Sequence, residues 1–257
     1  MAVVQIIGRK GSKSRKAISE HTGIRLFTGK GKAPDVIVNY GLAGRKLNAF
    51  LRKTPKAKEI PIINKYVGRP KHLAIKDAEK AGVKVPETRL SLPRTANLSD
   101  WIEKRVHSSQ GLGIKKATHR GQLLGKYYQK MIKDRRYELR VHAFLWLPDD
   151  EWVINKRTGP TDQIAWNFHQ GGHFSSVRYP NKYKVFKEAK DISKKILEVR
   201  NMAFGAVDLI VDNDMQVYFI EVNSSPGFSI FNEGVYVGAM NELKALTAKE
   251  ARKFGRR

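Results

Sequence analysis

The feature that most constrains the fold is a pair of apolar segments near the C-terminus, separated by a short polar turn. Ala206–Val211 and Gln216–Val222 each have the length and composition of a buried strand. The turn Asp212-Asn213-Asp214 between them is rich in residues that favour chain reversal. The sequence therefore predicts an antiparallel hairpin with both strands inside the protein.

Three oxygen-bearing side chains lie within this hairpin. Asp208 is in the first strand, and Glu221 and Asn223 are two residues apart in the second, so the latter two point to the same side. Carboxylate and amide oxygens suit Mg²⁺ or Mn²⁺ rather than zinc or copper. A metal ion would offset the cost of burying the carboxylates. The alternative is a solvated strand face, which the flanking apolar runs disfavour.

A second polar cluster alternates with apolar residues in the segment Tyr137–His142. Leu139 and Val141 belong to an apolar face, whereas Glu138, Arg140 and His142 share the other face. The planar fork of Arg140 matches two oxygens of a phosphoryl group. Taken alone, the cluster fits an exposed ion pair between Glu138 and a neighbour better than a functional site.

Two glycine-containing segments have the composition of loops over a site. Lys104–Gly113 forms a turn between two expected strands, and glycine lets backbone N–H groups approach phosphates closely. It lacks the Gly-Lys-Ser/Thr of a P-loop. Ile164–Gly172 places Asn167 ahead of two adjacent glycines. Each segment by itself also fits an ordinary hairpin or loop.

The remaining pattern indicates an α+β protein with mostly antiparallel strands and helices packed on them. Residues 1–65 read as a small basic α/β lobe of βαβ type, and we expect the basic end of the chain, from Arg252, to be frayed. Further strands are expected at Val3–Ile7, Asp35–Asn39, Trp101–Val106, Gly113–Ala117, Tyr127–Ile132, Tyr137–Leu147 and Trp152–Arg157, and helices near 12–21, 42–51, 69–81, 185–199 and from Asn232.

Composition narrows the possible chemistry. The chain has 49 Lys and Arg against 24 Asp and Glu, and residues 1–65 alone carry 15 against 3. Such a positive field attracts nucleic acid, acidic peptides or phosphorylated substrates, although it also fits a surface that serves only solubility. The absence of cysteine excludes disulfides, thiolate metal sites and cysteine nucleophiles. With no apolar run long enough for a membrane span, we expect a soluble cytoplasmic protein without membrane partners.

Taken in order, these segments resemble the ATP-grasp superfamily, and most closely its RimK-like branch of carboxylate–amine ligases, which add glutamates to a protein's C-terminus. The resemblance covers roughly residues 61 to 245. It is carried by Lys71 ahead of Gly82 and Pro86, Lys104…Gln110-Gly111-Leu112-Gly113, Gln129-Lys130-Met131-Ile132, Glu138-Leu139-Arg140, Asn167…His169 before Gly171-Gly172, and Asp208 with Glu221-Val222-Asn223-Ser224-Ser225-Pro226-Gly227.

The resemblance implies an ATP-grasp fold in which two α+β subdomains sandwich ATP, preceded here by the small basic βαβ lobe. On this reading residues 66–257 form the ATP-grasp domain. It would comprise a subdomain with a phosphate flap at about 66–128, a metal-binding subdomain at about 129–245 and a basic tail at 246–257.

The resemblance also implies roles for individual residues. Lys71 and Lys104 would contact the nucleotide phosphates, Gln110, Gly111 and Gly113 would belong to the flap, and Gln129, Lys130, Met131 and Ile132 would bind adenine. Glu138 would lie near the ribose, Arg140 on the γ-phosphate and Asn167 beside it as a further catalytic residue, while Asp208, Glu221 and Asn223 would bind Mg²⁺ or Mn²⁺.

The implied reaction uses ATP as co-substrate to phosphorylate a carboxylate, which an amine then attacks. We expect the partners to be an amino acid such as glutamate and an acidic protein or peptide acceptor. Candidate acceptor-binding residues are Arg9, Lys10, Lys13 and Ser225. Two alternatives stay open at this stage: a nucleic-acid-binding protein that kept the scaffold without turnover, and an ATP-grasp kinase. The sequence does not indicate an oligomeric state.

Overall fold

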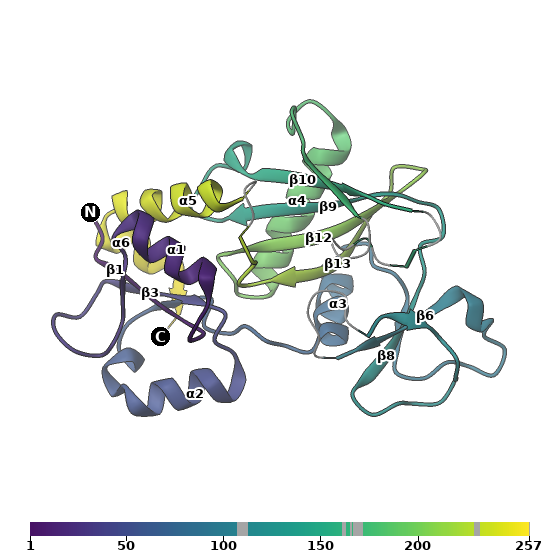
Figure 1. Cartoon of the computed structure of the whole chain (residues 1–257), viewed down its shortest axis with the longest axis horizontal. Helices are drawn as coiled ribbons and strands as arrows, with labels where there is room; N and C mark the ends of the chain where they lie inside the picture. The colour runs from purple at the N-terminus through teal and green to yellow at the C-terminus, as the bar shows by residue number, and fades with distance from the viewer. Residues whose placement is uncertain (107–112, 161–162, 165, 167–171, 229–231, 257) are drawn as a thin grey trace.

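The computed structural model describes residues 1–106, 113–160, 163–164, 166, 172–228 and 232–256. In this part of the chain the strands form three sheets, which follow one another along the long axis of the molecule (Figure 1). The N-terminal sheet and the small sheet that contains β6 and β8 lie at opposite ends, with the central sheet between them (Figure 1).

The N-terminal sheet is parallel except at one edge and has the strand order β14-β4-β3-β1-β2. Its strands are β1 (Val4–Gly8), β2 (Arg25–Leu26), β3 (Val36–Tyr40), β4 (Ile62–Ile63) and β14 (Gly255–Arg256). Helix α1 (Lys13–Thr22) begins after the cap residue Ser12 and ends at Gly23. Helix α2 (Gly44–Lys53) is followed by the 3₁₀ turn η1 (Pro55–Lys58). The predicted strand–helix–strand beginning is thus confirmed.

The described part of the tail, residues 246–256, is ordered, so the expectation that it is frayed is wrong. After α5 (Glu233–Ala245), Thr247 and Glu250 form a reciprocal capping box that starts α6 (Ala248–Lys253). Strand β14 then pairs antiparallel with β4, and the Phe254 ring packs against Trp146 at 6.0 Å between centroids. The strand pairing and the packing of Phe254 stabilise this segment in spite of its positive charge, because its basic side chains extend into solvent.

The central sheet is antiparallel throughout, with the order β11-β10-β9-β12-β13. Its strands are β9 (Arg135–Phe144), β10 (Val153–Thr158), β11 (His173–Ser176), β12 (Phe204–Asp212) and β13 (Val217–Asn223), and the turn η3 (Asp149–Glu151) connects β9 to β10. Helix α4 (Lys184–Val199) covers one face of this sheet, and α3 (Lys71–Lys80) packs against β13. The predicted hairpin is present as β12 and β13.

The small sheet has the order β5-β8-β6-β7 and is also antiparallel. Its elements are β5 (Thr88–Arg89), η2 (Leu98–Asp100), β6 (Trp101–Arg105), β7 (Lys115–Lys116) and β8 (Lys126–Lys130). A separate apolar cluster that includes Trp101 and Tyr128 holds it together.

An aromatic cluster joins the N-terminal sheet to the central sheet. Tyr40 at the end of β3 stacks on Phe204 of β12 at 6.1 Å, and Tyr236 of α5 contacts both Tyr40 and Phe144 edge-on. Each of these rings is fully buried, and such burial contributes about 1.5–3 kcal/mol per side chain. This cluster fixes the loops that follow β1 and β3 beside the end of β13.

No helix in the described part of the chain combines the length and the apolar character that crossing a bilayer demands.

Candidate functional site

A pocket of about 1250 Å³ lies between the central sheet and the small sheet. Strands β9, β12 and β13 provide one wall, while β6 and β8 provide the opposite wall. The linker before α3 and the loops after β1 and β3 close one end. Residues from all three sheets therefore meet around a single cavity.

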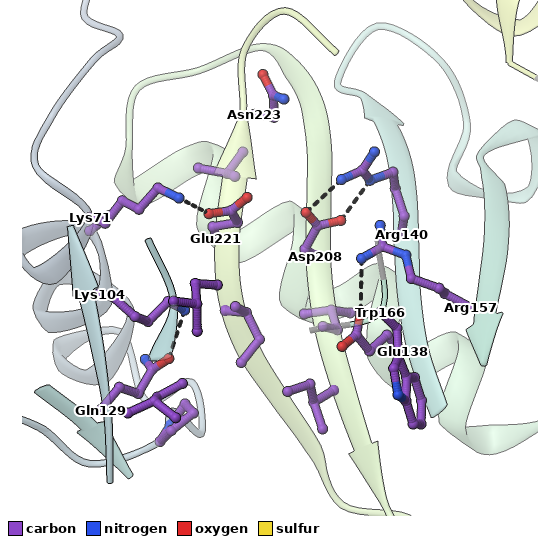
Figure 2. A pocket seen from close by; sticks show the side chains of 18 of the residues that line it. Lys71, Lys104, Gln129, Glu138, Arg140, Arg157, Trp166, Asp208, Glu221 and Asn223 are labelled. Atoms are coloured by element: carbon purple, nitrogen blue, oxygen red, sulfur yellow. Dashed lines mark hydrogen bonds and ion pairs between the residues drawn. The ribbon is translucent and has the colours of Figure 1, made fainter. Parts of the chain in front are cut away.

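The three oxygen-bearing side chains singled out in the sequence share this cavity. Asp208 of β12 and Glu221 of β13 are directly opposite in the strand register, and Asn223 follows two residues later on β13 (Figure 2). Directly opposite residues have Cβ atoms about 5 Å apart. Lys71, the first residue of α3, reaches across the pocket edge and contacts Glu221 with its Nζ atom 2.5 Å from Oε2.

Arg140 of β9 is the direct cross-strand neighbour of Asp208. Its Nε and Nη2 atoms donate to Oδ1 and Oδ2 of the carboxylate at 2.6 and 2.7 Å. Burial acts to raise the pKa of Asp208, but the charge of Arg140 holds that pKa below its ordinary value. Asp208 is therefore an ionised carboxylate in a largely buried position.

Lys104 occupies the opposite wall and is buried. Its Nζ atom donates to Oε1 of Gln129 at 2.9 Å, and Nε2 of Gln129 donates to Thr88 Oγ1 at 3.3 Å. Burial and the nearby charge of Lys71 lower the pKa of Lys104 to about 8, against the opposing effect of Glu221. The charge of Lys104 is therefore sensitive to its burial and to the charged side chains around it.

The segment at the end of β8 forms the far end of the pocket. Lys130, Met131 and Ile132 all line it. The N–H groups of Lys130 and Met131 donate to the carbonyls of Glu87 and Asp100, both at 2.8 Å. These bonds hold an extended backbone at the position where the resemblance implied adenine.

Glu138 lies in a buried cluster of charges rather than in an open position. Arg135 and Arg157 each donate to one of its carboxylate oxygens at 2.8 Å. The Trp166 ring stacks on the Arg135 guanidinium, with 3.7 Å from the guanidinium carbon to the ring centroid. Burial raises the pKa of Glu138, although both arginines act in the opposite direction.

Arg157 is a pocket residue that the sequence reasoning missed. It pairs with Glu138 across β10 and β9, and it lines the same cavity as Arg140. The signal was present in the strand alternation, because Asn155 and Arg157 share a face of β10. That face becomes recognisable as a pocket wall only once the pairing of β10 with β9 is known.

The candidate acceptor residues divide into two groups. Arg9 and Ser225 line the pocket at the end away from β8, and Arg9 Nε donates to the Gly41 carbonyl at 3.3 Å. Ser225 N donates to Asn223 Oδ1 at 3.0 Å, so the loop after β13 is tied to the carboxylate cluster. Lys10 and Lys13 are exposed and do not line the cavity.

Some predicted site residues lie outside the described residues. Gln110, Gly111 and Asn167 belong to this group. Gly113 is described, has a φ of 79° and does not line the pocket.

The oxygen donors on β12 and β13 are of the kinds that Mg²⁺ binds. The described residues hold no group of three or more His, Cys, Asp or Glu side chains that gathers for metal binding. Two carboxylates with one amide remain, and such all-oxygen sets suit Mg²⁺, which takes its other ligands from water and phosphate. The residues therefore fit Mg²⁺ together with a phosphorylated ligand, and both carboxylates are charge-paired within the protein.

No model of a known protein family matches the sequence, and no curated protein resembles it in sequence. Solved structures do resemble the chain in fold. The ATP-grasp ligase PsnB complexed with minimal precursor has a TM-score of 0.61 at 13% identity, over 94% of this chain and 100% of that one. D-alanine–D-alanine ligase from Bacillus anthracis complexed with ATP has a TM-score of 0.61 at 14% identity, over 97% of both chains.

A further similar structure is the macrocyclase MdnC bound with precursor peptide MdnA from Microcystis aeruginosa MRC. Its TM-score is 0.58 at 11% identity, over 94% of this chain and 98% of that one. These matches span nearly the whole length of each protein. The chain has the ATP-grasp fold, which confirms the fold predicted from the sequence.

Proposed function

We propose that this protein is an ATP-dependent carboxylate–amine ligase that forms an amide bond through an acyl-phosphate. The observation that carries the proposal is the arrangement of the pocket. Asp208 and Glu221 lie opposite each other, and Lys71, Lys104 and Arg140 surround them with positive charge. The ATP-grasp fold, shared with solved ligases, supports the same class of reaction.

ATP would lie along the cavity between the two sheets. The adenine would contact Lys130, Met131 and Ile132, and the phosphates would extend toward Lys71, Lys104 and Arg140. Glu138 would face the ribose. This orientation places the phosphates beside the paired charges of the β12–β13 end, whereas Met131 and Ile132 offer apolar contacts at the β8 end, between Lys130 and Lys133.

Asp208, Glu221 and Asn223 would hold Mg²⁺ when it is bound with the nucleotide. The ion would supply neutralisation of phosphate charge during transfer. Lys71 and Arg140 would then pair with phosphate oxygens instead of with the two carboxylates. A structure of PsnB contains Mg and ADP, which supports this assignment for the shared fold.

In the first step an oxygen of the substrate carboxylate attacks the γ-phosphorus, and the bond from that phosphorus to the β–γ bridging oxygen breaks. ADP leaves with the bond electrons. Arg140 and Lys104 contribute by holding the phosphoryl oxygens in line and by balancing their charge, because phosphoryl transfer depends mainly on positioning and electrostatics.

In the second step a neutral amine attacks the carbonyl carbon of the acyl-phosphate. The C–N bond forms, the C–O bond to phosphate breaks, and the nitrogen loses one proton to solvent or to phosphate. No nucleophilic side chain is needed, which agrees with a chain that lacks cysteine. The loop from Asn223 to Gly227 would bring the two substrates together.

For the substrates, we infer an amino acid such as glutamate and an acidic protein or peptide. The net charge of +25 and the position of Arg9 at the pocket end support an anionic acceptor. PsnB and MdnC were solved with precursor peptides, which supports a peptide for this fold. The motifs of the chain resemble those of the RimK-like branch, which supports the choice of glutamate.

The strong positive charge also favours a second candidate function, nucleic-acid binding without turnover. The presence of both carboxylates and all three cations in one cavity argues against it, because a protein without turnover has no need to keep them. A kinase would share the same phosphate site, and only the Asn-Ser-Ser-Pro-Gly segment after Glu221 favours the ligase over it.

A screen of amino acids with acidic peptides, followed by phosphate release and mass spectrometry, tests the proposal. The ligase predicts phosphate and ADP only when an acid and an amine are both present, together with a mass gain on the acceptor. A stable phosphorylated product that accumulates without an amine would establish a kinase. Salt-sensitive RNA binding that ignores ATP, with no product, would establish the binder.

A further inference from the structure

Helix α2 carries an unusual concentration of positive charge that neither the fold nor the pocket uses. Four cations occupy its ten residues, and two more follow in η1. All six are exposed, and none forms an ion pair with a carboxylate in the described chain. They are Arg45, Lys46, Arg52, Lys53, Lys56 and Lys58.

The four helical cations share one face. Arg45 and Arg52 are seven residues apart, as are Lys46 and Lys53, so each pair lies two turns apart on the same side. Ala49 stands between them. The opposite side of α2 is apolar, and Leu47 packs there into the core of the N-terminal sheet. The charged face is therefore turned away from the protein interior.

Only half of this charge is placed to stabilise the helix, because Arg52 and Lys53 lie in the last turn, where the helix dipole favours cations. Arg45 and Lys46 lie in the first turn, where the helix dipole disfavours positive charge, and the turn has neither an acidic residue nor a side-chain cap. An acidic residue there would serve folding better. A function other than stability accounts for keeping two cations at this end.

Helix α2 begins at the edge of the pocket. Ala43, directly before α2, lines the cavity and touches Gly68 on the linker to α3: a Cβ on Gly68 would lie 2.4 Å from the Ala43 Cβ. None of the α2 residues lines the cavity, so the helix starts at the pocket edge and leads away from it. In Figure 1 it lies on the outer side of the N-terminal sheet, opposite α1 and α5.

Further positive charge lies beyond the other end of the helix. Gly29 abuts Thr54, the residue that ends α2, and the exposed Lys30 and Lys32 follow in the same loop. The helix is about 15 Å long, which an extended peptide covers in about five residues. An acidic segment of about ten residues would reach from the pocket edge to Lys30 and Lys56.

We propose that the outer face of α2 is a docking surface for an acidic peptide segment of the acceptor, and that this surface leads the segment's reactive end into the pocket. This inference rests on the proposed function. Exposed cations at spacings of one and seven residues suit the carboxylates of an extended chain. The aromatic residue of α2, Phe50, packs against Phe27 and the core of the N-terminal sheet, so its ring is engaged there, which argues for a peptide over a single-stranded nucleic acid.

The test compares two variants that lose the same charge. One replaces Arg45, Lys46, Arg52 and Lys53 with Gln. The control replaces four exposed lysines of α4, Lys184, Lys187, Lys194 and Lys195, with Gln. Glutamine retains helix propensity, and circular dichroism with thermal unfolding checks that both variants fold.

Binding is measured by fluorescence anisotropy in the full-length protein with three labelled probes: oligo-glutamate of about ten residues, oligo-glutamine of the same length, and single-stranded RNA. We expect the α2 variant to bind oligo-glutamate about tenfold more weakly than the parent protein, and the affinity of the control variant to change by less than about twofold. Oligo-glutamine should not bind measurably to the parent or to either variant.

Equal losses in the two variants would overturn the proposal, because net charge alone would then explain binding. A loss confined to RNA would overturn it in favour of a nucleic-acid surface. The failure of the proposed function is separable. If the peptide bound to α2 but no ATP-dependent product formed, the proposed ligase activity would be contradicted. If the enzyme turned over and the α2 substitutions left the KM for the acceptor unchanged, only the proposed docking surface would be contradicted.

Discussion

Arg140 and Asp208 face each other across β9 and β12, and the arginine fork binds both carboxylate oxygens. Arg140 thereby balances the charge of Asp208, whose side chain is only 14% exposed. In the proposed reaction the same arginine would pair with a phosphoryl group while the carboxylate binds a metal ion. One side chain thus serves stability in the free protein and charge neutralisation in the proposed reaction.

Replacement of Arg140 with Gln should therefore affect stability and turnover together. Removing one partner of a largely buried ion pair costs about 3–5 kcal/mol, because the other charge is left uncompensated. Loss of a donor to the transferred phosphoryl should lower kcat by about 10²–10³. Urea unfolding and a phosphate-release assay measure the two effects.

The matched control for this change is Arg136→Gln, on the same strand but exposed to solvent. It should alter stability by less than about 0.5 kcal/mol and leave kcat unchanged. If both variants behaved alike, Arg140 would have no special role in the pocket.

The lowered pKa of Lys104, about 8, predicts a pH-dependent affinity for ATP. The lysine loses its charge as the pH rises through 8, whereas the phosphates are already fully ionised. ATP affinity should therefore fall about tenfold between pH 7.5 and pH 9. Lys104→Met should bind weakly at both values, with a flat profile in titration calorimetry. A parent profile as flat as that of the variant would rule out a charged lysine at the phosphates.

The buried His142 predicts a loss of stability in mild acid. Its ring contacts Tyr236 and Asn155, and burial together with the nearby charge of Arg140 lowers its pKa from 6.5 to about 3. Between these values the unfolded chain binds a proton that the folded protein does not. Stability should thus fall as the pH drops from about 6.5 toward 3, by about 2 kcal/mol at pH 5.

Denaturant unfolding at several pH values measures this contribution. His142→Gln keeps a side chain that donates and accepts hydrogen bonds but does not titrate, so its stability should change less between pH 7 and pH 5. An equal slope in parent and variant would show that other groups cause the acid sensitivity.

Gly41 predicts a specific effect on the acceptor end of the pocket. Its φ is 87°, and an added Cβ would lie 2.3 Å from Ser225 Oγ. Gly41→Ala should displace Ser225 and raise the KM for the acceptor several-fold, with little change in ATP affinity. It should also destabilise the protein, by backbone strain of about 1–2 kcal/mol and by overpacking of about 1–3 kcal/mol.

Gly23→Ala separates the two causes of that destabilisation. Gly23 also has a positive φ, 70°, but an added Cβ would meet nothing within 4 Å. This variant should show the strain alone and a normal acceptor KM. A similar rise in acceptor KM in both variants would mean that Ser225 does not shape the acceptor site.

Much of the site could be predicted because its residues lie in strands with a regular alternation of faces. The two-residue spacing of Glu221 and Asn223 and the hairpin with Asp208 follow from local sequence alone. The position of Lys71 could not be derived in this way, because its contact with Glu221 spans 150 residues and depends on how α3 packs against β13. Only the family resemblance pointed to it.

The parts that sequence reasoning missed depend on long-range pairing. Arg157 belongs to the pocket because β10 pairs with β9, and β14 forms because β4 offers a free edge. A segment such as Phe254–Arg256 has no strand signal of its own. Its basic composition favours a frayed end until the neighbouring strand and the Trp146 ring are taken into account.

The most direct test of the central claim is titration calorimetry of ATP with and without Mg²⁺, in the parent protein and in Glu221→Gln. The substitution removes one carboxylate from the proposed metal site without changing its size. We expect magnesium-dependent ATP binding in the parent protein and its loss in the variant. Because the substitution also removes the ion pair with Lys71, the free energy of unfolding should fall by no more than about 1 kcal/mol. Equal ATP binding by both proteins, or binding in the parent that ignores Mg²⁺, would contradict the proposed nucleotide site.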